Sequence, residues 1–373
     1  MLGSRPKMPL GTKSSRRHRR QLKGHAKAIV PNPFLALLAS VKQDIDQRLE
    51  AHFADQLELV APHGREVAAM VASLARLGLR GGKRLRPALL AAGYRLVLPK
   101  ADLEPALEAG LALELLHTYL LVHDDWMDGD ALRRGGPTVH AELAKRLKSE
   151  RRGHATAILA GDFAASLALD VLSRVKAPLA NGPLLFGAFA RMQRDATLGQ
   201  VLDVASDDHD PEAIYALKTG SYTVLGPLRL GALLAGAKPS TLKAIDAFAT
   251  PVGIAFQLAD DHLSAFGDPQ ATGKALGNDL RAGKRTPLVL EALKRARGSD
   301  RRALSHAFGN ARASVKAVTQ ALAVLERSGA KKKIETRIEQ LLAQGLAGLG
   351  AGVTRQGREL LEGAALALTS RRV

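Results

Sequence analysis

The stretch "LEAGLALELLHTYLLVHDDWMD", residues 107–128, is a long apolar run that ends in three aspartates. Its apolar residues recur at helical spacing, so it predicts a buried helix that carries the acids into the protein interior. Asp124 and Asp128 are four residues apart and therefore lie one turn apart on the same helix face, while Asp125 points off that face. Carboxylates packed this closely repel one another unless a cation or solvent relieves the repulsion.

The rest of the chain repeats this helical character on both sides. From Pro31 onward, Ala- and Leu-rich amphipathic segments alternate with breaks at Gly and Pro, and aromatic residues make up only 4% of the sequence. Alternating runs of β-branched residues are nearly absent, which disfavours strands. The sequence therefore predicts an all-α fold, a large helix bundle of ten to thirteen helices that forms a single domain over residues 31–373.

The charge of the chain is concentrated at its start. The formal net charge is +18, and residues 1–27 contain nine Lys and Arg but no acid. We interpret residues 1–30 as a basic, disordered and solvated tail; nucleic-acid binding, contact with an anionic membrane and a targeting role remain alternatives. The sequence contains no cysteine, which excludes disulfides and thiolate chemistry and is compatible with a reducing cytoplasm. No uncharged run reaches about 18 residues, so no transmembrane segment is predicted.

A second acidic pair lies far downstream in "GIAFQLADDHLSAFGD", residues 253–268. There an apolar helical stretch ends in Asp260 and Asp261, with Gln257 about one turn before Asp260. Two acidic pairs, each at the end of an apolar helix, suggest two walls of one metal-lined cavity. Mg²⁺ suits such a site because it takes one or two carboxylates, keeps several waters and binds substrate phosphate oxygens.

Basic residues beside glycine turns complete the pattern. "GLRGGKRLRP" (78–87) offers Lys83, Arg84 and Arg86, and Arg133 and Arg134 directly follow the first acidic helix. Three further segments contribute Lys218 and Thr219 in "LKTG", Lys274 in "TGKALG" and Lys284 in "AGKRT". Arginine binds phosphate in a bidentate fork and lysine acts as a point charge, so the combination predicts a phosphate-ester substrate. No Walker loop, GxGxxG loop, HExxH helix or nucleophile elbow accompanies these residues.

Seven motifs in order resemble the trans-isoprenyl diphosphate synthase (polyprenyl synthetase) family. These are "GGKRLRP", "DDWMDGDALRRGGPT", "AGDFAASLAL", "TLGQVLDV", "LKTG", "FQLADD" and "GNDLRAGKRT", and the resemblance runs from about Pro31 to the end. It implies an all-α fold around a central catalytic cavity, usually in a homodimer. The implied reaction is the Mg²⁺-dependent 1'-4 condensation of isopentenyl diphosphate with an allylic diphosphate such as dimethylallyl, geranyl or farnesyl diphosphate.

The resemblance also implies a role for each matching residue. Asp124 and Asp128 would hold two Mg²⁺ ions and Asp260 a third, with Asp125 and Asp261 in support. Further residues would bind the allylic diphosphate, namely Arg133, Lys218 and Lys284 with Lys274 nearby. The isopentenyl diphosphate would be held by Lys83, Arg86, His117 and Arg134. Thr219 and Gln257 would lie close to the developing allylic cation.

Two positions bear on activity and product length. Ser264 stands where many family members have a third aspartate in the second motif, which puts activity mildly in doubt. Tyr119 and Leu120 precede the first aspartates by about one turn, where the resemblance implies that a bulky side chain would stop chain growth. We therefore expect a short-chain product, geranylgeranyl diphosphate, with farnesyl diphosphate as the alternative. The other classes considered are a terpene cyclase, a non-catalytic subunit of a heteromeric synthase and a nucleic-acid-binding protein.

Overall fold

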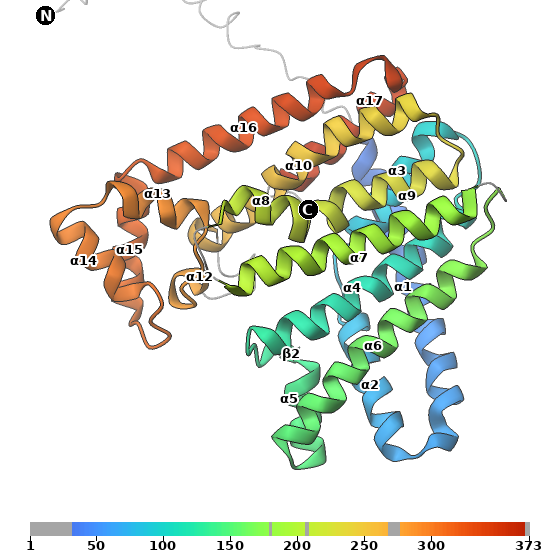
Figure 1. The fold of residues 1–373 in the computed structure, drawn as a ribbon, viewed down its shortest axis with the longest axis horizontal. Coiled ribbons are helices and arrows are strands. Elements are labelled where there is room, and N and C mark those ends of the chain that lie inside the picture. Colours follow the sequence, from blue (N-terminus) through green and yellow to red (C-terminus); the bar gives the residue numbers. More distant parts are fainter. Residues whose placement is uncertain (1–31, 179–180, 206–208, 268–276, 370–373) are drawn as a thin grey trace, which may run out of the picture. The chain divides into compact units, whose positions relative to one another are not determined.

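The computed structural model describes residues 32–178, 181–205, 209–267 and 277–369 (Figure 1). The predicted tail and Lys274 lie outside the described residues. The helices are α1 (Pro33–Val60), η1 (Ala61–His63), α2 (Arg65–Leu79), α3 (Leu85–Val97), α4 (Glu104–Met127), α5 (Val139–Leu147), α6 (Glu150–Arg174), α7 (Gly182–Ala205), α8 (Pro211–Tyr215), η3 (Ala216–Leu225), α9 (Gly226–Leu234), α10 (Pro239–Phe266), α12 (Asn278–Arg281), α13 (Pro287–Arg295), α14 (Gly298–Ala307), α15 (Val315–Arg327), α16 (Ala330–Gly348), η4 (Gly350–Gly352) and α17 (Arg355–Thr369).

The all-α prediction is confirmed. Across the described ranges the only strands are β1 (Leu132–Arg133) and β2 (Gly136–Pro137), which pair as a small antiparallel hairpin. The helical segments are more numerous than the ten to thirteen expected, because short helices such as α8 and α12 leave no periodic pattern long enough to recognise in the sequence. The segment η3 is a π-helix that joins α8 and α9 without a break.

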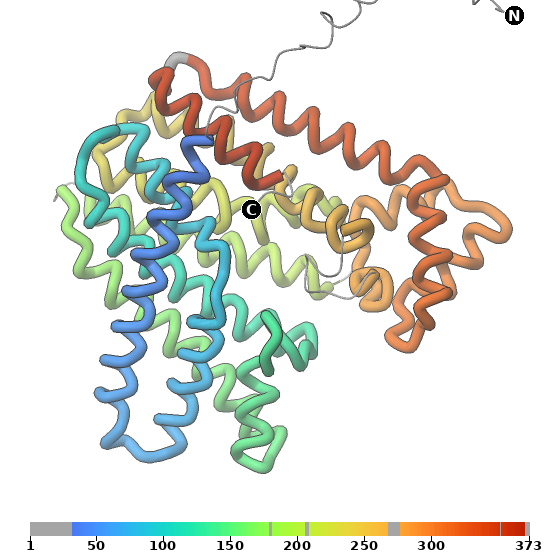
Figure 2. The backbone as a smooth tube through the Cα atoms, turned by 180° about the vertical axis from the view of Figure 1, so that it is seen from behind, coloured from blue at the N-terminus to red at the C-terminus, as the bar shows by residue number. Residues whose placement is uncertain are grey.

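The larger hydrophobic core surrounds α4. Helices α1, α2, α3, α6, α9 and α17 contribute to it together with the first half of α10, and Phe34, Phe53 and Phe248 are almost completely buried in it. Helix α4 packs against α6 along its length and also contacts α1, α3 and α9. Figures 1 and 2 show α4 enclosed in this way from opposite sides. The apolar run of the sequence is thus a central helix of the bundle, and its acidic end is held by the surrounding helices.

Close backbone contact between α3 and α9 depends on two glycines. A Cβ at Gly93 would lie 2.1 Å from the carbonyl oxygen of Leu228, and one at Gly231 would lie 1.9 Å from that of Leu90. Neither helix backbone can move aside locally, so a side chain at either position would force the helices apart. Since α3 begins directly after the basic "GGKR" loop, this contact also fixes the position of that loop.

A second, smaller core lies toward the C-terminus. Helices α13, α14, α15 and α16 pack around the second half of α10, and Leu288, Leu304 and Leu325 are buried there. Figure 1 shows α13, α14 and α15 grouped together, with α10 and α16 extending from them toward α9 and α17. The second acidic pair lies near the end of α10 and is therefore set against this second core.

Three described helices, α4, α6 and α10, are long and apolar enough to cross a membrane by length and composition alone. The prediction of no such segment considered only uncharged runs, whereas these stretches tolerate one or two charges. The most apolar window is 72% buried inside the protein in α4, 44% in α6 and 56% in α10. Packing against neighbouring helices therefore accounts for most of the apolar surface of α4 and for part of that of α6 and α10.

Candidate active site

Helix α4 presents the first acidic motif at its C-terminal end. Asp128 caps the helix, and its backbone N–H donates to the carbonyl of Asp124 at 2.8 Å. The side chains of Asp124 and Asp128 are 25% and 23% exposed, so both are reachable from solvent. Gly129 follows with a φ of +68°, a left-handed conformation that ends the helix and turns the chain toward the hairpin.

Asp125 differs from its neighbours because its side chain is fully buried. Burial raises its pKa to about 6, although Arg133 opposes the rise by donating from Nε to Oδ1 at 2.6 Å. The second carboxylate oxygen, Oδ2, has no hydrogen-bond partner among the described residues. Asp125 therefore holds Arg133, and its supporting role at a metal site stays a prediction.

The hairpin turns two adjacent arginines in opposite directions. Arg134 and Gly135 form its two-residue loop with φ values of +52° and +73°, as a type I′ turn requires. The guanidinium of Arg133 lies beside the acids, with Nη2 3.7 Å from Asp124 Oδ2. Arg134 instead donates to the carbonyl of Gly81 and lies 3.5 Å from His117 Nε2.

Two lysines from distant segments meet the acids of α4. Lys218 in η3 places Nζ 3.2 Å from Asp124 Oδ1 and 2.5 Å from Asp203 Oδ2 of α7. Lys284, between α12 and α13, places Nζ 3.3 Å from Asp128 Oδ2. Burial opposes the charge on each lysine, but the neighbouring carboxylates outweigh it and raise both pKa values, so both lysines stay cationic.

The backbone around Lys218 is held by close packing. A Cβ at Gly199 of α7 would lie 2.3 Å from the Lys218 backbone nitrogen, so α7 and η3 touch at this point. In a π-helix the turns are wider than in an α-helix, and such segments occur frequently at functional sites. Here Lys218 and Thr219 both lie within the π-helix.

The second acidic pair divides into an exposed and a buried member. Asp260 is exposed, whereas Asp261 is only 8% exposed. Asp261 accepts hydrogen bonds from Tyr215 O–H and from Gln257 Nε2, the latter at 2.9 Å, and Gln257 Oε1 accepts from Thr219 Oγ1 at 2.8 Å. This network links the end of α8 and η3 to α10, and it joins three of the predicted site residues.

Burial raises the pKa of Asp261 to about 7, while the bonds from Tyr215 and Gln257 oppose the rise. The folded protein therefore favours protonated Asp261, and its stability falls as the pH rises from the unfolded pKa near 3.8 toward 7. For metal-free protein in EDTA we expect Asp261→Asn to raise the free energy of unfolding by about 1–3 kcal/mol at pH 8 and hardly at all at pH 4. Urea denaturation at both pH values measures this, with the exposed Asp170→Asn as control. If wild type and Asp261→Asn were equally stable at pH 8, ionisation of Asp261 would not lower the free energy of unfolding.

The residues of "GGKRLRP" have different environments. Lys83 is exposed, Arg84 is 4% exposed, and Arg86 stacks over the ring of Tyr222 at 4.4 Å and donates to Thr223 Oγ1 at 2.8 Å. Arg84 itself contacts Asp46 and Glu114 and not the active-site region. The sequence reads as one basic cluster, but only Lys83 and Arg86 remain available to a ligand.

His117 and Arg134 lie beside this loop, and burial and the positive charges around them lower the pKa of each. Burial, with Arg86 and Arg134 close by, holds the pKa of His117 well below its ordinary value, so the imidazole is neutral. Burial and the neighbouring arginines also lower the pKa of Arg134. An anion would relieve this repulsion. Arg86, His117 and Arg134 thus lie close together, whereas Lys83 is exposed in the adjacent loop.

Tyr119 and Leu120 are half-buried on α4 against the larger core, one turn before the acids. The Tyr119 ring meets the edge of His123 with centroids 4.9 Å apart, and His123 Nε2 lies 3.1 Å from the carbonyl oxygen of Ile158 in α6. Ser264 is half-buried on α10, and its Oγ has no hydrogen-bond partner among the described residues. It lines a very small cavity with Asp261 and Asp279.

The acids suit a divalent metal by their donor chemistry. No group of three His, Asp or Glu side chains is gathered for metal binding within the described ranges. This arrangement still fits Mg²⁺, because that ion needs only one or two protein carboxylates and takes its other oxygens from water and phosphate. Asp124, Asp128 and the exposed Asp260 could each supply such a carboxylate.

Sequence reasoning missed several partners of the site residues. Asp203 lies within the quoted motif "TLGQVLDV", which was the available signal, but no role was assigned to it. Tyr215, Tyr222 and Thr223 flank the "KT" pair and bond Asp261 or Arg86. Their roles depend on contacts between segments far apart in the chain, and local spacing does not predict these.

Comparison with known proteins gives a consistent result. A sequence model described as polyprenyl synthetase matches residues 68–325. A short chain isoprenyl diphosphate synthase of Methanocaldococcus jannaschii is 33% identical over 253 residues, covering 66% of this chain and 73% of the relative. The farnesyl diphosphate synthase of Escherichia coli is 36% identical over 273 residues, covering 68% and 87%. The crystal structure of a geranylgeranyl pyrophosphate synthase from Corynebacterium glutamicum, complexed with isoprenyl diphosphate and magnesium, superposes with a TM-score of 0.83 at 32% identity, covering 90% of this chain and 99% of that one.

Proposed function

We propose that this chain, which belongs to the polyprenyl synthetase family and is a short-chain trans-prenyltransferase, makes geranylgeranyl diphosphate. It would do so by condensing isopentenyl diphosphate with allylic diphosphates. The observation that carries the proposal is the interleaving of acids and cations around the end of α4. There Arg133, Lys218 and Lys284 each contact one of the predicted metal-binding aspartates. A site of this kind can bind metal ions and a diphosphate together.

We propose that the allylic diphosphate binds on this side of the hairpin. Arg133, Lys218 and Lys284 remain charged in the folded protein and would donate to its oxygens as the C–O bond ionises. Mg²⁺, with three ions held by Asp124, Asp128 and Asp260, would supply further positive charge at the leaving group. Thr219 and Gln257 are hydrogen-bonded to each other and would face the developing cation with their oxygen atoms.

Isopentenyl diphosphate would bind on the other side of the hairpin. Lys83, Arg86 and Arg134 offer three cations there, and the neutral His117 can donate a hydrogen bond without adding to their repulsion. No protein nucleophile is needed, because the double bond of this substrate attacks the allylic carbon. The protein therefore contributes mainly orientation of the two substrates and stabilisation of the leaving diphosphate.

The experiment that tests this function is a product assay. Purified protein is incubated with Mg²⁺, labelled isopentenyl diphosphate and each of dimethylallyl, geranyl and farnesyl diphosphates, and the dephosphorylated alcohols are sized. A C20 alcohol that disappears with EDTA is expected. A C15 end point would retain the family and favour farnesyl diphosphate, an alternative supported by the similarity to the Escherichia coli farnesyl diphosphate synthase. A lack of condensation with every primer would contradict the proposal and favour a non-catalytic subunit.

Tyr119 is the proposed limit to product length. Its ring packs against His123 of the same helix, which contacts the carbonyl of Ile158 in α6, and it lies about one turn from Asp124. We expect Tyr119→Ala to lengthen the main product by at least one C5 unit, because truncation removes the bulk in the path of the growing chain. Tyr119→Phe keeps the ring and is the matched control. If Tyr119→Ala gave the same product distribution as wild type, the stop would have to lie elsewhere, Leu120 being the next candidate.

We propose that the protein is a cytoplasmic homodimer. Helices α6 and α7 expose several large apolar side chains that a second copy could cover, namely Ile158, Leu159, Leu169, Leu184, Phe186, Leu198 and Val201. A chain without cysteine is compatible with a reducing compartment. Sedimentation equilibrium tests the assembly, with a mass of twice 39.6 kDa expected.

A further inference from the structure

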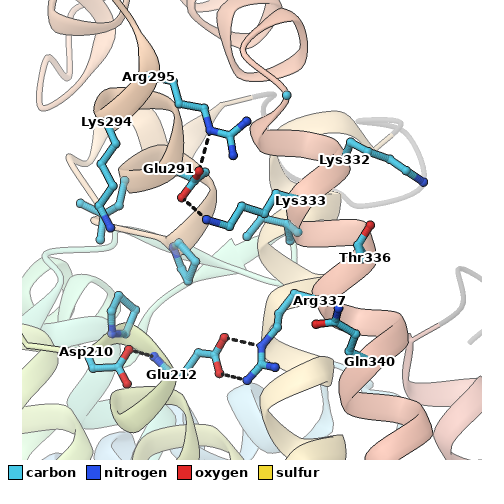
Figure 3. Close-up of a pocket in the computed structure, with 15 residues that line it drawn as sticks. Asp210, Glu212, Glu291, Lys294, Arg295, Lys332, Lys333, Thr336, Arg337 and Gln340 are labelled. Carbon is cyan, nitrogen blue, oxygen red and sulfur yellow. Dashed lines mark hydrogen bonds and ion pairs between the residues drawn. The ribbon is translucent and has the colours of Figure 1, made fainter.

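A cavity of about 760 Å³ lies away from the acidic motifs, among α8, α13 and α16 (Figure 3). Its volume is within the range of pockets that bind small molecules. Neither acidic motif lines it, and no residue with a predicted role in prenyl transfer does so. The condensation reaction therefore leaves this cavity unexplained.

Ion pairs join the three helices at two ends of the cavity. Arg337 of α16 forms a two-pronged contact with Glu212 of α8, at 2.9 and 2.7 Å. Glu291 of α13 accepts from Arg295 at 2.6 Å and from Lys333 of α16 at 2.8 Å. Figure 3 shows these two groups facing each other across the opening. The cavity is thus framed by specific contacts and does not depend on loose packing.

The lining carries an excess of positive charge. Its charged side chains comprise five cations and three carboxylates, namely Lys294, Arg295, Lys332, Lys333, Arg337, Asp210, Glu212 and Glu291. Among the described residues neither Lys294 nor Lys332 has a side-chain partner, and both are exposed. Two cations in excess match the charge of one dianion, such as a phosphate monoester.

Between the charged groups the lining is aliphatic. Pro211, Pro287, Leu290 and Ile334 come from all three helices, and none of the described lining residues is aromatic. A nucleotide would lack a surface on which to stack its base. An aliphatic or isoprenoid chain would instead bury apolar surface against these residues, at about 25 cal/mol per Å².

From these features we infer a second ligand site, which binds an amphiphilic phosphate: an apolar chain lies along Pro211, Pro287 and Leu290, and the phosphate lies at the cationic rim of the cavity within reach of Lys294. The position of the site ties it to the proposed reaction. Helix α8 continues directly into η3 with Lys218, and α13 begins three residues after Lys284. A ligand that bridges α8, α13 and α16 therefore restrains both segments that supply these lysines.

The test is calorimetric titration of the full chain in EDTA with decyl phosphate, inorganic phosphate and decanol. Decyl phosphate should bind at least tenfold more tightly than either fragment. Lys294→Glu with Lys332→Glu should weaken its binding at least tenfold. The control pair Lys238→Glu with Lys316→Glu makes the same charge change at exposed lysines outside the cavity and should bind within twofold of wild type. An equal loss in both pairs, or no binding to wild type, would overturn the inference.

Two further arms locate the ligand and identify its source. Lys83→Ala with Lys284→Ala removes two cations of the proposed active site and should leave decyl phosphate binding unchanged; loss of binding there would place the ligand in the active site and refute the second site. Farnesyl phosphate binding at least tenfold tighter than decyl phosphate would indicate an isoprenoid ligand, and equal binding a general amphiphile. The inference does not depend on the proposed function. We expect the Lys294→Glu, Lys332→Glu variant to lose decyl phosphate binding while it still forms product, which would show that the second site is separate from the active site.

Discussion

Asp124→Ala is expected to lower kcat/KM for prenyl transfer by about a thousandfold or more, while the protein remains folded. Asp124 has two of the site's cations beside it, with Lys218 Nζ at 3.2 Å and Arg133 Nη2 at 3.7 Å. Loss of a metal-holding carboxylate removes charge stabilisation at the leaving group, an effect that is worth several kcal/mol in the transition state. A thousandfold loss corresponds to about 4 kcal/mol.

The fold should survive because the neighbouring cations keep other partners. Lys218 still contacts Asp203 at 2.5 Å, and Arg133 still contacts the buried Asp125. Product formation with saturating Mg²⁺ measures the effect, and thermal unfolding checks the fold. Asp170→Ala, which removes an exposed acid paired with Arg174 on α6, is the matched control and should keep full activity. Activity of Asp124→Ala within tenfold of wild type would contradict a metal-holding role.

Arg84→Met is expected to cause the largest loss of stability, about 3–5 kcal/mol in the free energy of unfolding. The Arg84 side chain is 2% exposed and joins three helices. Its guanidinium contacts Asp46 of α1 at 2.7 Å, Glu114 of α4 at 2.6 Å and the carbonyl of Gly78 in α2 at 3.0 Å. Removal of the cation leaves Glu114, only 3% exposed, as an unpaired buried charge.

Chemical denaturation measures this loss, and two further variants sharpen the test. Lys83→Ala changes the adjacent but exposed residue, so its stability should be within about 0.5 kcal/mol of wild type while KM for isopentenyl diphosphate rises. Adding Asp46→Asn and Glu114→Gln to Arg84→Met should recover part of the stability, chiefly because the buried Glu114 is then neutral, whereas Asp46 is partly exposed and also contacts Lys42. If the triple variant were no more stable than Arg84→Met alone, the loss would come from packing and not from unpaired charge.

The sequence was sufficient to predict the fold class and the placement of the first acids. The long apolar run predicts α4, and four-residue spacing places Asp124 and Asp128 on one side of its end. These are local properties that follow from helix geometry. The resemblance to a family then indicated Lys218 and Lys284, and the structure brings both to the acids of α4. Their chemical roles stay predictions.

What could not be predicted depends on long-range contacts or on an unusual backbone. Arg84 adopts a left-handed conformation, with a φ of +49°, which turns its side chain inward while Lys83 stays outside. No local pattern distinguishes these two residues. The bond from Tyr215 to Asp261 spans 46 positions. The π-helical register of η3 likewise leaves no periodic signature in the Ala- and Leu-rich sequence around it.

The hairpin connects the loop before α3 to the acids of α4 mechanically. Arg80, at the end of α2, donates to the carbonyls of Pro137 at 2.6 Å and of Arg133 at 3.2 Å, and Arg134 donates back to the carbonyl of Gly81. These bonds tie the hairpin to the loop before α3, and in the proposed reaction the hairpin serves both substrates, the allylic diphosphate through Arg133 and isopentenyl diphosphate through Arg134. A substrate bound to Arg134 would therefore restrict the hairpin backbone that also positions Arg133 for the other substrate. Under the proposed assignment we therefore expect a substitution in the hairpin to change KM for both substrates, so such a change does not by itself identify which diphosphate site was altered.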